Sequence, residues 1–173
     1  MIAIGIFKED DPVELISGWI VPKMPRKPPH DSTVTRLQRS LWTMLGTEWV
    51  IRAQCAVTLD DSEPEPDITV AVGPDGRYDD HHPGPTEIAL VIEVADTSLV
   101  RDREEKAPAY AAAQLPLYWI VNLPNRQVEV YDQPTPDGSM YGRRRVYQID
   151  DDVPLIVFGR QVGLIPVREI LPL

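Results

Sequence analysis

The sequence predicts an α/β fold in which helices flank a mixed β-sheet, and three patterns predict it. Apolar residues recur at helical spacing from Ser32 to Leu45. Residues 87–95 form a near-continuous apolar run rich in Val and Ile, which is typical of a central strand buried on both faces. A second helical stretch follows that run, and further strand-like segments follow it in turn. Helices and strands in this order are expected to pack as layers on one sheet.

Strand-like segments account for much of the remaining chain. They share either an alternation of apolar and polar residues or a continuous apolar run, bounded by turn residues. They lie at residues 13–21, as a hairpin turning at Ser17-Gly18, and at 51–59, 66–72, 117–121, 127–131 and 145–149. Because no internal repeat or domain boundary is visible, residues 1–173 are expected to form a single domain.

The first helix is expected to follow a rigid connection. Residues 22–29 are typical of a basic, proline-rich linker. Asp31 or Ser32 is expected to cap the helix, which ends before Gly46. A later loop at residues 73–85 contains His81-His82, and because adjacent side chains point in different directions we expect a surface position there, with no metal site.

The second helix is expected to begin after Ser98 as N-cap and to end near Gln114. Pro108 lies inside it, where a proline removes one helical hydrogen bond and predicts a kink. A final helical turn is expected at residues 167–171.

Composition narrows the class of protein. At 173 residues, 43% hydrophobic and 25% charged, the chain has the composition of a globular domain. No apolar run is long enough to span a membrane and residues 1–10 lack the features of a signal peptide, so a cytoplasmic location is expected. Cys55 is the single cysteine, so an internal disulfide and a cysteine-based zinc site are excluded.

The net charge of −10 opposes non-specific attraction to nucleic acid. A local basic rim such as residues 143–145 can nevertheless serve a small site.

Glu93 is the first candidate for a functional site, because it lies near the end of the apolar run. An unpaired charge there costs several kcal/mol, so a partner is expected. Asp67, at the start of the strand 66–72, and Lys106, in the following helix, are available. Two carboxylates at strand ends and a lysine can hold a divalent cation against a phosphodiester. Taken alone, these three residues favour a buried ion pair with a structural role over a metal site, and Lys106 also fits a solvated i,i+4 pair with Asp102.

An ordered set of motifs resembles the Uma-type family of putative restriction endonucleases, which is placed in the PD-(D/E)XK nuclease superfamily. The motifs are Pro66-Asp67, Glu93-Val94 at the end of the apolar run, Asp102-x-x-x-Lys106-x-x-x-Tyr110, residues 117–121 and residues 126–131. Members of the family open with an acidic hairpin and a proline-rich segment before a His and the first helix. The matching positions are Glu14, Gly18, Met24 and His30.

The resemblance implies a restriction-endonuclease-like core with an N-terminal β-hairpin, and a metal-dependent endonuclease that hydrolyses DNA phosphodiester bonds. Asp67, Glu93 and the backbone carbonyl of Val94 would then bind Mg²⁺ or Mn²⁺, ions that prefer oxygen ligands. The superfamily's usual lysine would stand at Ala95; the resemblance implies that Lys106 replaces it and positions the attacking water. Homodimerisation is also expected, since two-strand cutting in this superfamily often uses paired sites.

Departures from the family pattern keep an alternative open. Trp19 stands where many members carry an acid, Asp96 is unusual beside the strand, and Pro108 calls the reach of Lys106 into question. These residues and the negative net charge of the chain fit a catalytically inactive nuclease-fold module with a binding or regulatory role. Convergence of Asp67, Glu93 and Lys106 within ~5 Å of one position separates the two readings. Tyr110 is expected only to support the site. His30 is a candidate to line the site, but helix capping or a surface position is favoured for it.

Overall fold

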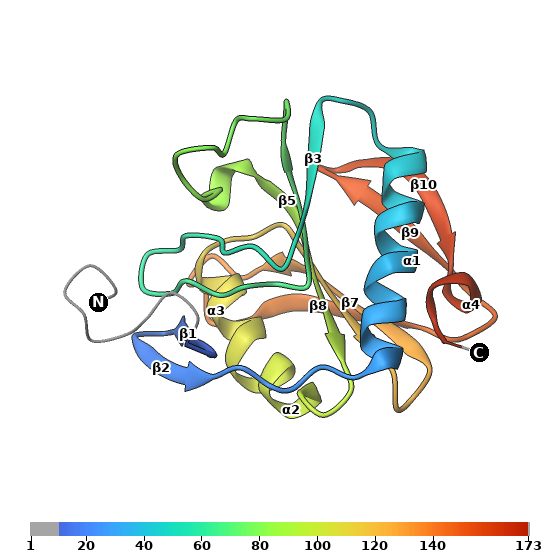
Figure 1. Cartoon of the computed structure of the whole chain (residues 1–173), viewed down its shortest axis with the longest axis horizontal. Helices are drawn as coiled ribbons and strands as arrows, with labels where there is room; N and C mark the ends of the chain where they lie inside the picture. Colours follow the sequence, from blue (N-terminus) through green and yellow to red (C-terminus); the bar gives the residue numbers. More distant parts are fainter. Residues whose placement is uncertain (1–10, 173) are drawn as a thin grey trace.

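Six strands form the central sheet of the computed structural model, which describes residues 11–172. Their order across the sheet is β3-β4-β5-β6-β7-β8, and only β5 and β6 are parallel (Figure 1). The strands are β3 (Trp49–Ala53), β4 (Ile68–Val72), β5 (Ile88–Ala95), β6 (Leu117–Asn122), β7 (Gln127–Pro134) and β8 (Tyr141–Tyr147). All eight residues of β5 are buried, so the predicted central strand and the mixed α/β sheet are confirmed.

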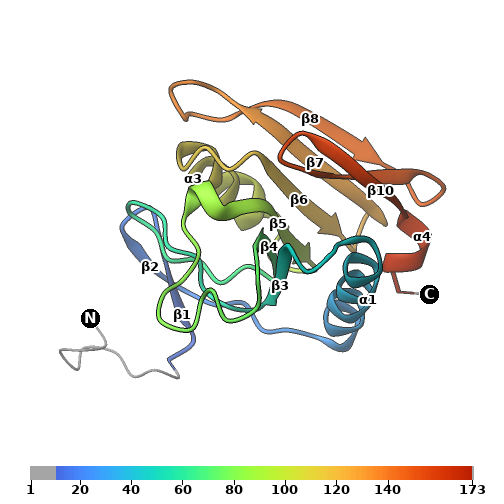
Figure 2. The ribbon, with the colours of Figure 1, turned by 90° about the horizontal axis from the view of Figure 1, so that it is seen from above.

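Helices and a C-terminal hairpin cover the sheet, and an N-terminal hairpin lies beside it (Figure 2). One face carries α1 (Pro28–Met44), the hairpin of β9 (Asp152–Val157) and β10 (Arg160–Pro166), and α4 (Val167–Ile170). The other face carries one continuous helical segment, made of α2 (Leu99–Arg101), the π-helical turn η3 (Asp102–Lys106) and α3 (Ala107–Ala112). A short 3-10 turn, η2 (Pro85–Glu87), precedes β5, and β1 (Val13–Ile16) pairs with β2 (Trp19–Pro22) as the predicted N-terminal hairpin.

Two hydrophobic cores hold these layers together. The larger core lies between the sheet and α1, and includes Leu37, Leu41, Leu90, Ile92, Trp119, Val130, Leu155 and Ile170. The smaller core lies between the sheet and the helical segment, and includes Val57, Ile88, Val91, Tyr110, Leu115, Tyr118 and Ile120. Since side chains alternate along a strand, the two faces of β5 supply the two cores. Among the described residues, no helix is long and apolar enough to cross a membrane.

Several predicted boundaries are wrong, each for a local reason. The first helix begins at Pro28 and not at Ser32, because proline is already shaped for the first turn of a helix. The strand predicted at 51–59 ends at Ala53, where Gln54 takes a φ of +56° and turns the chain out of the sheet. The missed hairpin β9–β10 turns at Phe158-Gly159, both with positive φ, and Phe158 gives no turn signal. Residues 1–10, expected to carry no signal peptide, lie outside the described residues.

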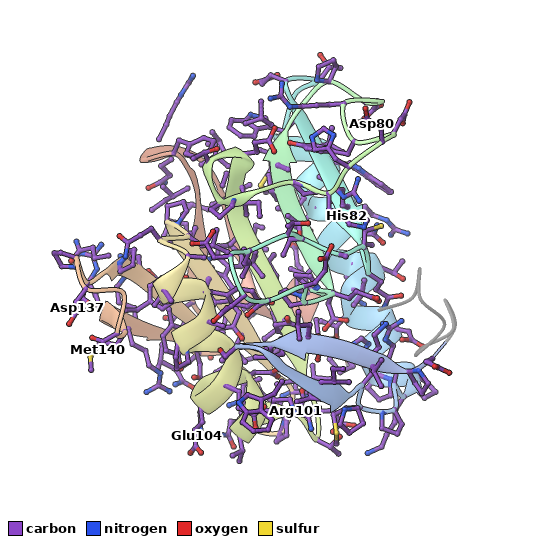
Figure 3. All side chains as sticks on the ribbon, turned by 90° about the vertical axis from the view of Figure 1, so that its left-hand side faces the viewer. Asp80, His82, Arg101, Glu104, Asp137 and Met140 are labelled. Atoms are coloured by element: carbon purple, nitrogen blue, oxygen red, sulfur yellow. The ribbon has the colours of Figure 1, made fainter. Side chains whose placement is uncertain are left out.

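Pro108 is accommodated by the π-helical turn, and the helical segment continues through it without a break. The N–H of Ala107 donates to the carbonyl of Asp102, five residues earlier. In a regular α-helix the ring of Pro108 would clash with the carbonyl of Glu104, and the wider π turn relieves that contact. Asp102 and Lys106 are both buried, whereas Glu104 points to solvent (Figure 3). The unusual turn therefore directs two charged side chains inward.

A buried carboxylate on β7 fixes this helical segment to the sheet. Glu129 is fully buried and accepts hydrogen bonds from Arg103 in η3 and from Asn122 on β6, the latter at 2.9 Å. The Tyr131 hydroxyl donates to it at 2.9 Å, and Arg144 on β8 pairs with it at 2.9 Å. Burial raises the pKa of Glu129, but these donors outweigh burial and hold the pKa at about 2.

Replacing Glu129 by glutamine is expected to destabilise the fold in a pH-dependent way. Because the folded pKa lies below the usual value near 4.5, the ionised carboxylate contributes stability above that pH. This contribution, on the order of 3 kcal/mol, is lost as the pH falls toward 2. Urea unfolding of both proteins at pH 7, 5 and 3 measures it. A difference in unfolding free energy that stays constant over this range would contradict the assignment.

Candidate active site

Asp67 and Glu93 lie opposite one another on neighbouring strands. Asp67 directly precedes β4, and the register that pairs Ile68 with Ile92 places it across from Glu93. The N–H of Val94 donates to Oδ2 of Asp67 at 2.8 Å, which ties the carboxylate to the end of β5. Asp67 is 6% exposed and Glu93 is 4% exposed, so both carboxylates lie at the floor of the site.

Lys106 reaches this pair of acids from the helical segment. Its Nζ lies 3.0 Å from Oε1 of Glu93 and 3.2 Å from Oε2 of Glu14. At 6% exposed it is not on a solvated helix face, so the surface pair with Asp102 is excluded. The hydroxyl of Tyr110 donates to the same Oε1 of Glu93 at 2.9 Å, a supporting contact. The structure thus brings Asp67, Glu93 and Lys106 together; their chemical roles stay predictions.

Two further residues belong to the site, and neither is among the three predicted catalytic residues. Glu14 on β1 is buried and contacts Lys106, so the N-terminal hairpin supplies a third acid. His30 lies in the first turn of α1, where its Nε2 is 3.0 Å from Oδ1 of Asp67. His30 thus lines the site, the less favoured of its predicted positions; the favoured prediction of a helix cap or a surface position is wrong, because its ring is buried against Asp67. The only signal for both residues was the family resemblance at these positions.

Asp102 is a fourth buried acid at the site. Its Oδ2 accepts a hydrogen bond from the hydroxyl of Ser98 at 2.7 Å. Ser98 is the N-cap residue of α2 as predicted, but its hydroxyl donates to the Asp102 side chain and makes no hydrogen bond to the helix backbone. Burial raises the pKa of Asp102 to about 6, and Lys106 and Ser98 oppose this shift.

The buried floor carries more acid than base. Burial raises the pKa of Glu93, and the nearby charges of Asp67, Asp102 and Glu14 raise it further, against the opposing effect of Lys106. His30 shows the converse: burial lowers its pKa, but its hydrogen bonds to Asp67 and Asp31 produce a net rise. Additional positive charge would be stabilised in this site.

These residues line a small pocket of about 60 Å³, which has room for a few water molecules or for a hydrated ion. Glu14, His30, Asp67, Glu93, Val94, Asp102 and Lys106 form its floor and walls, and Lys23, Arg26, Lys27 and Arg101 lie around it. The pocket therefore suits an ion and one edge of a larger substrate lying outside.

Other candidates lie away from the pocket. Arg143 and Arg145 pair with Asp132, and Arg144 pairs with Glu129, so residues 143–145 do not form the basic rim that the sequence suggested. His81 and His82 are exposed as predicted, and Figure 3 shows His82 in the upper half of the molecule, away from Arg101 near the bottom.

Comparisons with known proteins identify a family and a fold for the chain. A family model described as Uma2, putative restriction endonuclease, matches residues 2–165. The fold is similar to a crystal structure of a putative nuclease belonging to DUF820 from Anabaena variabilis ATCC 29413, with a TM-score of 0.71. That structure is 16% identical in sequence, and the match covers 97% of this chain and 94% of that chain. No curated protein matches the sequence.

Proposed function

The chain belongs to the Uma2 family of putative restriction endonucleases, and from this premise we propose that it is a metal-dependent endonuclease that cleaves DNA phosphodiester bonds. The observation that carries the proposal is the convergence of Asp67, Glu93 and Lys106 on one small pocket. Lys106 reaches Glu93 despite Pro108, because the π turn directs it inward. This contact removes the structural objection that the sequence raised.

The donor set fits Mg²⁺ or Mn²⁺. Among the described residues, no group of three His, Cys, Asp and Glu side chains forms a cage for a metal ion. Mg²⁺ needs no such cage, because it is usually held by one or two carboxylates and keeps several waters. Asp67, Glu93 and the carbonyl of Val94 would supply the protein ligands, and the pocket has room for waters. When bound, the ion would lower the pKa of a water and stabilise charge on the phosphate.

The chain's own residues prepare the site in three ways. The N–H of Val94 fixes the orientation of Asp67, and the hydroxyl of Tyr110 does the same for Glu93. The ammonium group of Lys106 donates to Glu93 and lies where it can orient a water or balance negative charge on the substrate. Nε2 of His30 lies 3.0 Å from Oδ1 of Asp67 and holds this second carboxylate oxygen, and the pKa of His30 is raised by its hydrogen bonds to Asp67 and Asp31.

A cleavage assay tests the proposal. Purified protein is incubated with supercoiled plasmid DNA in Mg²⁺, in Mn²⁺ or in EDTA, and the products are separated on a gel. We expect nicked or linear DNA only with a divalent ion, and none with the Lys106→Met variant. If the protein binds metal and DNA but cleaves neither strand under any condition, the alternative of a catalytically inactive binding module holds instead.

A further inference from the structure

One segment beside the pocket combines positive charge with a rigid backbone. Residues 23–27, Lys-Met-Pro-Arg-Lys, connect β2 to α1, and we name them the strap. The whole strap lines the small pocket. Residues 23–26 also line an open groove of about 680 Å³, together with Asp11, Pro12, Gln54 and Glu65. The strap is therefore shared by the groove and the acidic pocket.

The strap is fixed at both ends. The N–H of Lys23 donates to the carbonyl of Pro12 at 2.8 Å, and the guanidinium of Arg101 donates to the carbonyl of Pro22. Pro28 begins α1 immediately after the strap, and Pro25 restricts its middle. The side chains of the strap are therefore held out from a backbone that loses little freedom when it binds a ligand.

The positively charged side chains of the strap can exchange their present ion-pair partners for a ligand. Among residues 11–172, Arg26 forms no ion pair and its side chain is exposed. Lys27 pairs with Asp96 at 2.9 Å, but the side chains are 55% and 30% exposed, so this pair is weak. Lys23 pairs with Glu65 at 2.6 Å, and both residues line the pocket as well as the groove. Met24, which is 40% exposed, adds an apolar contact between the cations.

We propose that the strap binds the sugar-phosphate backbone of a DNA strand and guides it from the groove to the acidic pocket. This inference rests on the proposed function, which supplies the reacting phosphate. Arg26 and Lys27 would contact phosphates next to the reacting one, since fixed cations on a chain of net charge −10 concentrate a polyanion at one place. The exposed, unpaired guanidinium of Arg26 is suited to hold a phosphate through two parallel hydrogen bonds.

The test compares two double variants with the same change in charge. Arg26→Ala/Lys27→Ala removes two of the three cations of the strap. Arg39→Ala/Arg160→Ala removes two exposed arginines that line neither the pocket nor the groove. Binding of a fluorescein-labelled DNA duplex with single-stranded ends is measured by anisotropy in Ca²⁺ over a range of salt concentrations. The strap variant is expected to bind ~10-fold more weakly, with the slope of log K against log salt reduced by about 1 to 2.

The outcomes separate this inference from the proposed function. Equal affinities and salt slopes for the two double variants would overturn the role of the strap and leave the nuclease proposal standing. No binding of this DNA by the wild-type protein, even at low salt, would overturn both. Circular dichroism spectra and thermal midpoints of the variants confirm that they are folded.

Discussion

Replacement of Lys106 by methionine is expected to lower the free energy of unfolding by about 3 kcal/mol, because removing one partner of a buried ion pair leaves the other charges uncompensated. Lys106 is the cation that contacts both Glu93 and Glu14. For a chain of this size the thermal midpoint should fall by roughly 6 to 12 °C. Cleavage should be lost as well, since Lys106 is proposed to position the attacking water.

Divalent metal should partly restore the stability of the Lys106→Met variant. A bound cation replaces the missing positive charge among Glu14, Glu93 and Asp102, so Mg²⁺ should raise the thermal midpoint of the variant more than that of the wild type. The matched control is Lys27→Met, which removes an exposed lysine and should change stability by less than ~1 kcal/mol. Equal destabilisation by the two substitutions would contradict the buried position of Lys106.

Glu93→Gln is expected to reduce DNA cleavage at least ~100-fold while the protein stays folded. Glutamine has nearly the same volume and keeps an oxygen that accepts from Tyr110 and Lys106, but it loses the charge that would bind the metal. The thermal midpoint in EDTA should therefore stay close to that of the wild type. Comparing cleavage rates with folded fractions separates loss of chemistry from loss of structure.

A distant carboxylate provides the control for this substitution. Glu87 pairs with Arg77 in front of β5 and lies outside the pocket. Glu87→Gln removes the same charge and should leave the cleavage rate within about twofold of the wild type. Full cleavage by Glu93→Gln would mean that Glu93 is not a metal ligand and that the reaction, if any, depends on other residues.

Much of the fold was predictable because its signals are local. The apolar run of β5, the helical spacing in α1 and the turn at Ser17-Gly18 are each visible within a few residues. Features that depend on distant partners were not visible. The register of β4 against β5 decides that Asp67 faces Glu93, and the π turn before Pro108 decides that Lys106 points inward.

The site shows the same division between local and distant signals. Glu93 stood out because a charge inside an apolar run needs a partner. Glu14 and His30 lie in segments whose own sequence is ordinary, and only the packing of the hairpin and of α1 brings them to Lys106 and Asp67. The basic rim predicted at residues 143–145 was wrong, because a run of arginines in the sequence does not show which acids will pair with them in the fold.

Calorimetric titration of Mn²⁺ into the wild-type protein and its Asp67→Asn and Glu93→Gln variants tests the central claim most directly. The account predicts saturable binding of metal to the wild type, and a loss of at least ~100-fold in affinity in each variant, because each removes one of two carboxylate ligands. Absence of binding to the wild type, or equal binding to all three proteins, would contradict a metal site at Asp67 and Glu93.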